Sequence, residues 1–281
     1  MKYANLHLHS VHSDCQLTPH QLVLIGKSLG YQALALTDHE TDSGVKEFMY
    51  YAGRQGIQTI SGAEFYGMEG NVCLHLTALD YDMDNPAIRK FIKERCDAQN
   101  ECTRKRVELG IQKGIIDNLT WNDVLDLNPE GAWICVDSVV KVMKIKKLVP
   151  YDYNWTEFRA KIFKSPEALS FAPSVPTAEE VIKTVRKAEG VIALAHPNNQ
   201  THLVEKLVDY GLNGIEISHP HLWGHTPFLA QEAAEKYNLY RCGGTDHTGP
   251  MSGCGGNNAI PVFHGITEEE FNALRERRFL K

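Results

Sequence analysis

Short apolar runs of strand length alternate with amphipathic helical stretches along most of the chain, and this alternation limits the possible folds. Residues such as Thr18-Pro19, which start helices, and Gly30, which ends one, lie between the first two runs. Alternating β and α units imply a parallel sheet, either open or closed into a barrel. The runs occupy residues 3–8, 32–37, 57–60, 191–195, 212–217 and 239–243.

Two other segments complete the predicted strands. Residues 64–66 and 72–79 predict a hairpin that turns at Glu69-Gly70-Asn71. Residues 259–263 predict a weak final strand. Together with the six runs, this final strand gives about seven core strands, most of them parallel, in addition to the hairpin.

Helical periodicity replaces the alternation in the middle of the chain. We therefore predict a first barrel part over residues 1–84, a mostly helical insertion over 85–172, and a second barrel part over 173–281. A chain of 281 residues can bury a large core in one large or two small domains.

Composition excludes several classes of protein. The 29 Lys and Arg against 35 Asp and Glu give a formal charge of −6, which offers no basic surface for duplex nucleic acid. No apolar run approaches the roughly 18 residues of a membrane span, and the first residues lack the pattern of a secretory signal. We expect a cytoplasmic protein with no membrane partner.

The 13 histidines are informative because many of them, with carboxylates, follow the strand-length runs. His7 and His9 are two residues apart, so in an extended chain both side chains project from one face. The ends of parallel barrel strands converge on one rim, which would bring distant residues into one site. Residues in such positions are His7, His9, Asp38, His39, Glu64, His75, His196, Asp246 and His247.

Imidazole and carboxylate without thiolate form a ligand set for Zn, Mn or Fe. These groups are more numerous than one metal needs, so we predict two or three divalent ions. Polynuclear sites stabilise the attacking and leaving oxygens in displacement at phosphorus. The residues thus favour hydrolysis of phosphate esters.

In this order the motifs resemble those of the PHP family, the polymerase and histidinol phosphatase domain of metal-dependent phosphoesterases. The resemblance implies an α/β fold, a distorted (β/α)7 TIM-like barrel with a metal cluster at its rim. The helical insertion is similar to that of AMP-type and 3′,5′-bisnucleotide phosphatases. The matching segments are His7-Leu8-His9-Ser10, Ser13-Asp14, Thr37-Asp38-His39, Ser61-Gly62-Ala63-Glu64, His75, Ala195-His196-Pro197 and Gly244-Thr245-Asp246.

The resemblance also implies roles for individual residues. Glu64 and Asp246 would be central to catalysis, because they help to hold a metal-bridging hydroxide that attacks phosphorus. The implied ligands are His7, His9, Glu64 and Asp246 for one metal, Glu64 as a bridge with His75 and His196 for a second, and Asp14 and His39 for a third.

Two positions depart from the family pattern. Thr248 stands where the family carries a third-metal histidine, and neighbouring His247 is a candidate to take its place. Cys135-Val136-Asp137 stands where the nucleotide-cleaving subgroup carries Arg-Ala-His. These departures leave two substrate classes open, a nucleotide or other small phosphorylated metabolite and a ribose cyclic phosphate.

Further residues are candidates for binding or proton transfer. Arg104, Arg106 and His247 could contact a substrate phosphate, although a solvated helix face also explains the two arginines. His219 and His221 follow a predicted strand and could protonate the leaving group.

Two other functions compete with phosphoester hydrolysis. Amidohydrolase barrels also begin with H-x-H, but they commonly bridge their metals with a modified lysine, and no lysine follows a strand here. A non-catalytic metal or phosphate sensor would have lost several ligands, whereas only the position at Thr248 differs. The sequence does not define the oligomeric state.

Overall fold

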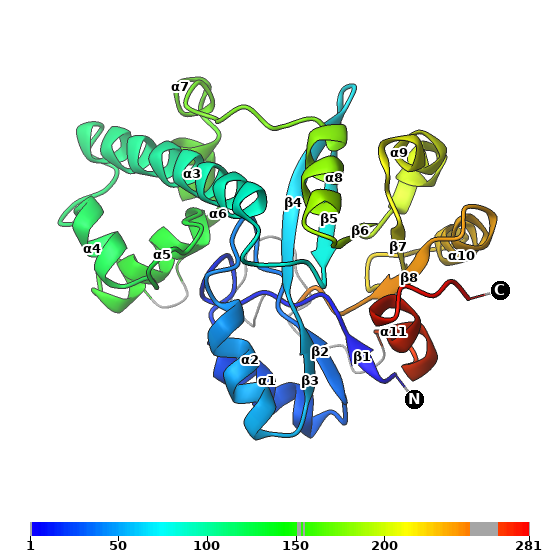
Figure 1. The fold of residues 1–281 in the computed structure, drawn as a ribbon. Coiled ribbons are helices and arrows are strands. Elements are labelled where there is room, and N and C mark those ends of the chain that lie inside the picture. The colour runs from blue at the N-terminus through cyan, green and yellow to red at the C-terminus, as the bar shows by residue number, and fades with distance from the viewer. Residues whose placement is uncertain (1, 151–152, 154, 248–263, 281) are drawn as a thin grey trace.

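The computed structural model describes residues 2–150, 153, 155–247 and 264–280, whose strands form two sheets (Figure 1). The first sheet is parallel, with the order β1-β2-β3. In the second sheet, β5 is antiparallel to both β4 and β6, and the later strands are parallel. The strands are β1 (Ala4–Asn5), β2 (Ala33–Ala35), β3 (Gln58–Ile60), β4 (Gly62–Glu69), β5 (Val72–Leu79), β6 (Val191–Leu194), β7 (Gly214–Ser218) and β8 (Tyr240–Gly243).

The predicted hairpin is confirmed as β4 and β5, which turn through Gly70-Asn71. Gly70 has a φ of 57°, a left-handed conformation that glycine adopts without steric cost. Tyr66 pairs with His75 across the hairpin. Because alternate residues share a face, Glu64 projects from the same side as His75.

The predicted closed barrel is not formed by regular strand pairing among the described residues. Single parallel bridges join the sheets instead, one between Leu8 and His247 and one between His39 and Glu64. Regular pairing ends where polar residues replace the apolar residues of the strands. Asp246 lies at this point, and its φ of 48° is one that extended strands do not adopt. The predicted strand at residues 259–263 lies outside the described residues.

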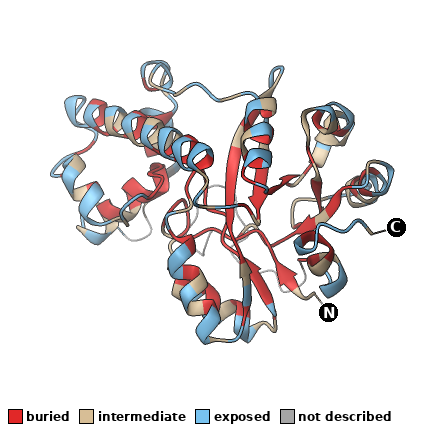
Figure 2. Ribbon diagram, in the orientation of Figure 1, coloured by how far each residue is buried: buried red, intermediate tan, exposed pale blue. Residues whose placement is uncertain are grey.

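Helices cover the outer faces of both sheets, and their inner sides are buried (Figure 2). The predicted helix start at Thr18 is confirmed, since its side chain accepts a backbone hydrogen bond there, and Thr177 and Thr267 cap two later helices in the same way. Among the described helices, none has the length and apolar character needed to cross a membrane. These covering helices are α1 (Pro19–Ser28), α2 (Val45–Arg54), α8 (Ala178–Lys187), α9 (Val204–Tyr210), α10 (Thr226–Lys236) and α11 (Glu268–Arg275).

The middle of the chain forms a helical layer to one side of the sheets (Figure 1). It has a hydrophobic cluster of its own around Val107, Val139, Phe158 and Ile162. The boundaries of the insertion at residues 85 and 172 stay a prediction. Its segments are α3 (Pro86–Gln112), α4 (Trp121–Asp126), α5 (Val136–Ile145), α6 (Trp155–Phe158), the π-helical η1 (Arg159–Phe163) and α7 (Pro166–Leu169).

A buried ion pair attaches α3 to the sheets. Nε of Arg95 lies 2.5 Å from Oε2 of Glu40, and the backbone N–H of Tyr66 donates to the other oxygen of Glu40 at 2.8 Å. Nη1 of Arg95 also donates to the carbonyl of Ser174 at 2.6 Å. A second attachment is the backbone hydrogen bond from Trp133 to the carbonyl of His12. The helical layer is therefore held against the segments that follow the first two strands.

We predict that Arg95→Ala lowers the free energy of unfolding by about 3–5 kcal/mol, because it leaves the Glu40 carboxylate buried and unpaired. Burial raises the pKa of Glu40 even beside Arg95, so the loss should shrink as the pH falls and Glu40 becomes protonated. Chemical denaturation at two pH values measures both effects. The control is Arg104→Ala on α3, where the loss should be much smaller because Arg104 pairs with Glu101 and Glu108, whose side chains are solvated. Equal costs for the two variants would contradict the prediction.

Candidate metal centre

The extension of β1 and the segment after β8 lie side by side and bring three predicted ligands together. The backbone N–H of Asp246 donates to the carbonyl of His7, and that of His9 donates to the carbonyl of His247. Nε2 of His9 then lies 3.0 Å from Oδ1 of Asp246, and Nε2 of His7 lies 3.6 Å from it. A Cβ on Gly244 would stand 2.4 Å from the backbone nitrogen of His7, so this close approach requires glycine.

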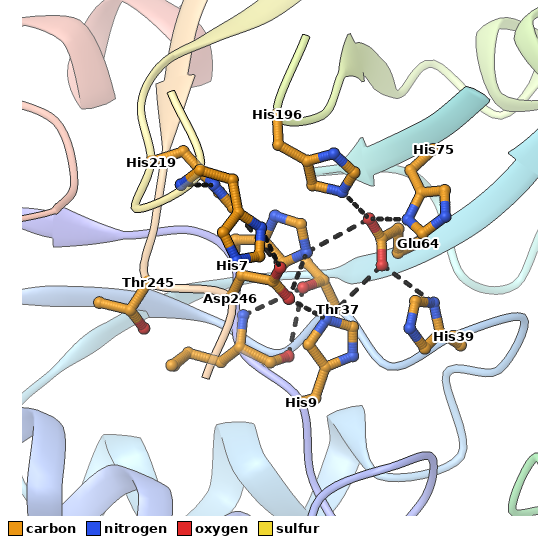
Figure 3. Close-up of polar contacts among 12 residues, drawn as sticks. His7, His9, Thr37, His39, Glu64, His75, His196, His219, Thr245 and Asp246 are labelled. Atoms are coloured by element: carbon orange, nitrogen blue, oxygen red, sulfur yellow. Dashed lines mark hydrogen bonds and ion pairs between the residues drawn. The ribbon is translucent and has the colours of Figure 1, made fainter. Parts of the chain in front are cut away.

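The carboxylate of Glu64 lies at the centre of the site, where imidazoles from several strand ends surround it (Figure 3). Its side chain is only 1% exposed. The imidazole nitrogens within 3.5 Å of its oxygens belong to His39 at 2.9 Å, His75 at 3.1 Å, His7 and His196 at 3.4 Å, and His9 at 3.5 Å.

Asp14 lies beside the same centre, on the loop after the H-x-H segment. One of its oxygens is 3.6 Å from Nδ1 of His9, and the other is 3.8 Å from Nε2 of His39. Asp38 fixes this loop, because it accepts hydrogen bonds from the hydroxyls of Ser10 at 2.6 Å and Ser13 at 2.5 Å. Asp38 is therefore a positioning residue.

Glu216, a buried carboxylate in β7, was not predicted from the sequence. Nδ1–H of His7 donates to it at 2.8 Å, and the backbone N–H of His196 donates to its other oxygen at 2.7 Å. Glu216 thereby orients one imidazole and one ligand-bearing turn. The available signal was a single acid inside the apolar run Gly214-Ile215-Glu216-Ile217.

The structure also brings His219 and His221 to this centre. Nε2 of His219 is 3.4 Å and Nδ1 of His221 is 3.8 Å from Oδ2 of Asp246. The backbone N–H of His221 donates to Nδ1 of His219 at 3.0 Å, which leaves Nε2 of His219 facing the carboxylate.

Imidazoles and carboxylates lie next to one another in the centre and shift each other's pKa values. Burial lowers the pKa of His9, but Asp14, Asp246 and Glu64 outweigh burial and raise it to about 9. Burial favours the neutral form of Glu64, yet the surrounding imidazoles hold its pKa well below the usual value. Protonated imidazoles thus balance the negative charge of the carboxylates. Bound divalent cations would balance the same charge and would replace these protons.

The donor groups fit divalent metal ions. Among the described residues, five overlapping sets have donor atoms within 4.8 Å of one another, namely His7-His9-Asp246, His7-Glu216-His219, His9-His39-Glu64, Glu64-His75-His196 and His219-His221-Asp246. Nitrogen and oxygen donors without thiolate suit Zn, Mn or Fe. Several buried donor atoms lack a hydrogen-bond partner among the described residues, which is the expected state of metal ligands. They are Nε2 of His7, Nε2 of His9, Nδ1 of His39, Oε2 of Glu64 and Nε2 of His219.

A cavity of about 440 Å³, here called the insertion cavity, connects the centre with the helical layer. Arg106 lines it, whereas Arg104 pairs with Glu101 and Glu108 and is not among the residues that line it. Its lining residues are Asp14, His39, Tyr66, His75, Gln99, Arg106, Trp133, Cys135, Val136, Asp137, Arg159, Phe163, Lys164 and Leu169.

The third-metal position is only partly described. His247 is buried and lines a separate small cavity with Leu22 and Leu34, so the structure does not bring it to the insertion cavity. Thr248 lies outside the described residues.

Solved structures share this fold. A Bifidobacterium adolescentis protein, assigned by inference as a metal-dependent phosphoesterase, has a TM-score of 0.80 at 23% identity, and the match covers 99% of this chain and 97% of that one. A Chromobacterium violaceum protein described as an amidohydrolase has a TM-score of 0.74 at 20% identity, over 98% and 96% of the two chains.

Curated relatives match over most of their length. A phosphoribosyl 1,2-cyclic phosphate 1,2-diphosphodiesterase from Eggerthella lenta is 24% identical, over 87% of this chain and 94% of the relative. A 3′,5′-nucleoside bisphosphate phosphatase from Chromobacterium violaceum is 28% identical, over 90% of each chain. A 5′-3′ exoribonuclease from Haemophilus influenzae is 28% identical, over 77% and 79%.

The PHP domain model matches residues 5–194, which include most of the strand-end ligands and the helical layer. The family predicted from the motifs is thereby confirmed, and this chain belongs to the PHP domain family.

Proposed function

We propose that the protein is a metal-dependent phosphoesterase that hydrolyses a small phosphorylated substrate. The observation that carries this proposal is the set of overlapping donor groups around Glu64, which opens into a cavity with basic side chains. Hydrolysis of phosphoester bonds is also the reaction class shared by the names of the curated relatives.

Two or three divalent ions, of Mn, Zn or Fe, would supply a nucleophile at neutral pH and neutralise phosphate charge. Glu64, His7, His9 and Asp246 would hold one ion, and Glu64, His75 and His196 would hold a second. Asp14 and His39 would hold a third.

Other side chains of this centre would act on the substrate directly. Arg106 and Lys164 line the insertion cavity, where their cations can bind phosphate oxygens. His219 and His221 lie on the other side of Asp246, within reach of a leaving oxygen bound there.

A ribose cyclic phosphate is a second candidate substrate. Asp137 lines the insertion cavity and is 8% exposed, in the position where the nucleotide-cleaving subgroup carries a histidine. A carboxylate there repels a second phosphate and accepts hydrogen bonds from sugar hydroxyls. The Eggerthella lenta relative is named for a cyclic phosphate of this kind.

We expect Mn-loaded protein to release phosphate from at least one ester, and chelator-stripped protein to release none. The panel contains nucleoside monophosphates, 3′,5′-bisphosphates, sugar phosphates and ribose cyclic phosphates, with free phosphate as the readout. A p-nitroanilide amide panel serves as the control for carbon–nitrogen hydrolysis. Tight metal binding with no turnover on any ester would contradict the proposal and favour a sensor.

We expect Glu64→Gln to lower the metal content per chain and to reduce kcat/KM by roughly 100-fold or more, because the bridging charge is lost. Metal content is measured by elemental mass spectrometry. Glu69→Gln is a matched control at the far end of the same strand, where Glu69 pairs with Lys206. Unchanged metal content and turnover in Glu64→Gln would show that this residue is not a ligand.

Glu216→Gln should weaken metal binding by about 10- to 100-fold, since the orienting carboxylate on Nδ1 of His7 is lost. Competition with a chromogenic chelator gives the metal Kd, and circular dichroism checks the fold. Glu235→Gln, at an exposed position on α10, should leave the Kd unchanged. A folded Glu216→Gln protein with the Kd of the wild type would exclude this positioning role.

A further inference from the structure

A second cavity, of about 420 Å³, opens at the ends of β6 and β7. We call it the Trp223 cavity. The described residues that line it differ from those that line the insertion cavity. It is formed by the start of η2 (Asn198–Leu203), which follows β6, and by the segment that leads from β7 into α10. Its described lining residues are Asn198, Asn199, His221, Trp223 and Thr226.

His221 connects this cavity with the metal centre. The residue lines the Trp223 cavity, and its Nδ1 lies 3.8 Å from Oδ2 of Asp246. The insertion cavity reaches the centre elsewhere, through His39 and His75. Figure 3 shows these two histidines on the opposite side of Asp246 from His219, the neighbour of His221. A group bound at the centre can therefore extend in two different directions.

The two cavities differ in charge. Arg106, Arg159 and Lys164 line the insertion cavity, together with two aspartates. No lysine, arginine, aspartate or glutamate is present among the described residues that line the Trp223 cavity. Apart from the imidazole of His221, the described lining of the Trp223 cavity offers a second phosphate no basic side chain, so this lining suits an uncharged group.

Trp223 gives this cavity an aromatic surface. Its side chain is 71% exposed, although burial of an indole is normally favourable. The side-chain amides of Asn198 and Asn199 add hydrogen-bond donors and acceptors to the same cavity. An aromatic face beside amide groups matches a nucleobase, which stacks through its ring and hydrogen-bonds through its edge.

We infer that the Trp223 cavity is a base subsite, which holds the nucleobase of a phosphoester whose phosphate is at the metal centre. This inference rests on the proposed function and narrows its substrate class to nucleotides. The sugar would then lie beside His221, between the metal centre and the Trp223 cavity. Ring stacking on Trp223 would favour nucleotides over sugar phosphates that carry no base.

The test compares AMP with ribose 5-phosphate, which has the same phosphate and sugar but no base. Trp223→Ala should lower kcat/KM for AMP by about 5- to 100-fold and leave kcat/KM for ribose 5-phosphate unchanged. Trp223→Phe should retain most of the activity on AMP. Phe228→Ala is the matched control, because Phe228 is 69% exposed on α10 and does not line the cavity. Equal losses on both substrates, or no loss on AMP, would overturn the inference, as would a wild-type preference for ribose 5-phosphate.

Adenosine binding separates this inference from the proposed function, because adenosine has no phosphate to hydrolyse. Saturation-transfer NMR on the purified protein should show contact with the adenine protons in the wild type and in Phe228→Ala. The contact should be lost in Trp223→Ala. If no ester is hydrolysed, the proposed function fails, and the adenosine signal alone decides the base subsite. An adenosine signal that is absent from the wild type, or equal in the wild type and Trp223→Ala, would overturn it.

Discussion

The contact between the Glu64 carboxylate and the imidazoles around it is the interaction on which the rest of the structure depends. A carboxylate that is 1% exposed loses its hydration, which costs several kcal/mol unless positive groups compensate. No single strand can supply them, because a strand presents only alternate residues to one face. Histidines from strand ends far apart in the sequence must therefore converge on one point.

This convergence explains why regular strand pairing stops at the centre. The chain around His7 and His9 lies next to Asp246, but only isolated bridges continue the pairing there. At these positions the side chains are buried polar groups, and Asp246 has a left-handed backbone. The two sheets thus lie edge to edge without closing into a barrel by regular strand pairing. Contacts between imidazoles and carboxylates stabilise their junction.

Local features were predictable from the sequence, because their signals lie within a few residues. The hairpin of β4 and β5, the threonine caps and the position of His7 and His9 at a strand end follow from periodicity and turn residues. Glu216 and the pair of Arg95 with Glu40 were not predicted, since each depends on contacts between distant segments. The metal-ligand roles themselves stay predictions, although the structure brings those donor groups together.

Divalent metal ions at such a centre would act on the phosphoryl oxygens, which all phosphate esters share, so they would not by themselves distinguish one ester from another. Selection among substrates must therefore arise in the cavities beside the centre. The insertion cavity depends on α3, which the buried Arg95 holds against Glu40. The described residues that line the Trp223 cavity belong to the segments after β6 and β7. Because the two cavities belong to different parts of the chain, changes in one can alter the substrate without disturbing the ligands around Glu64.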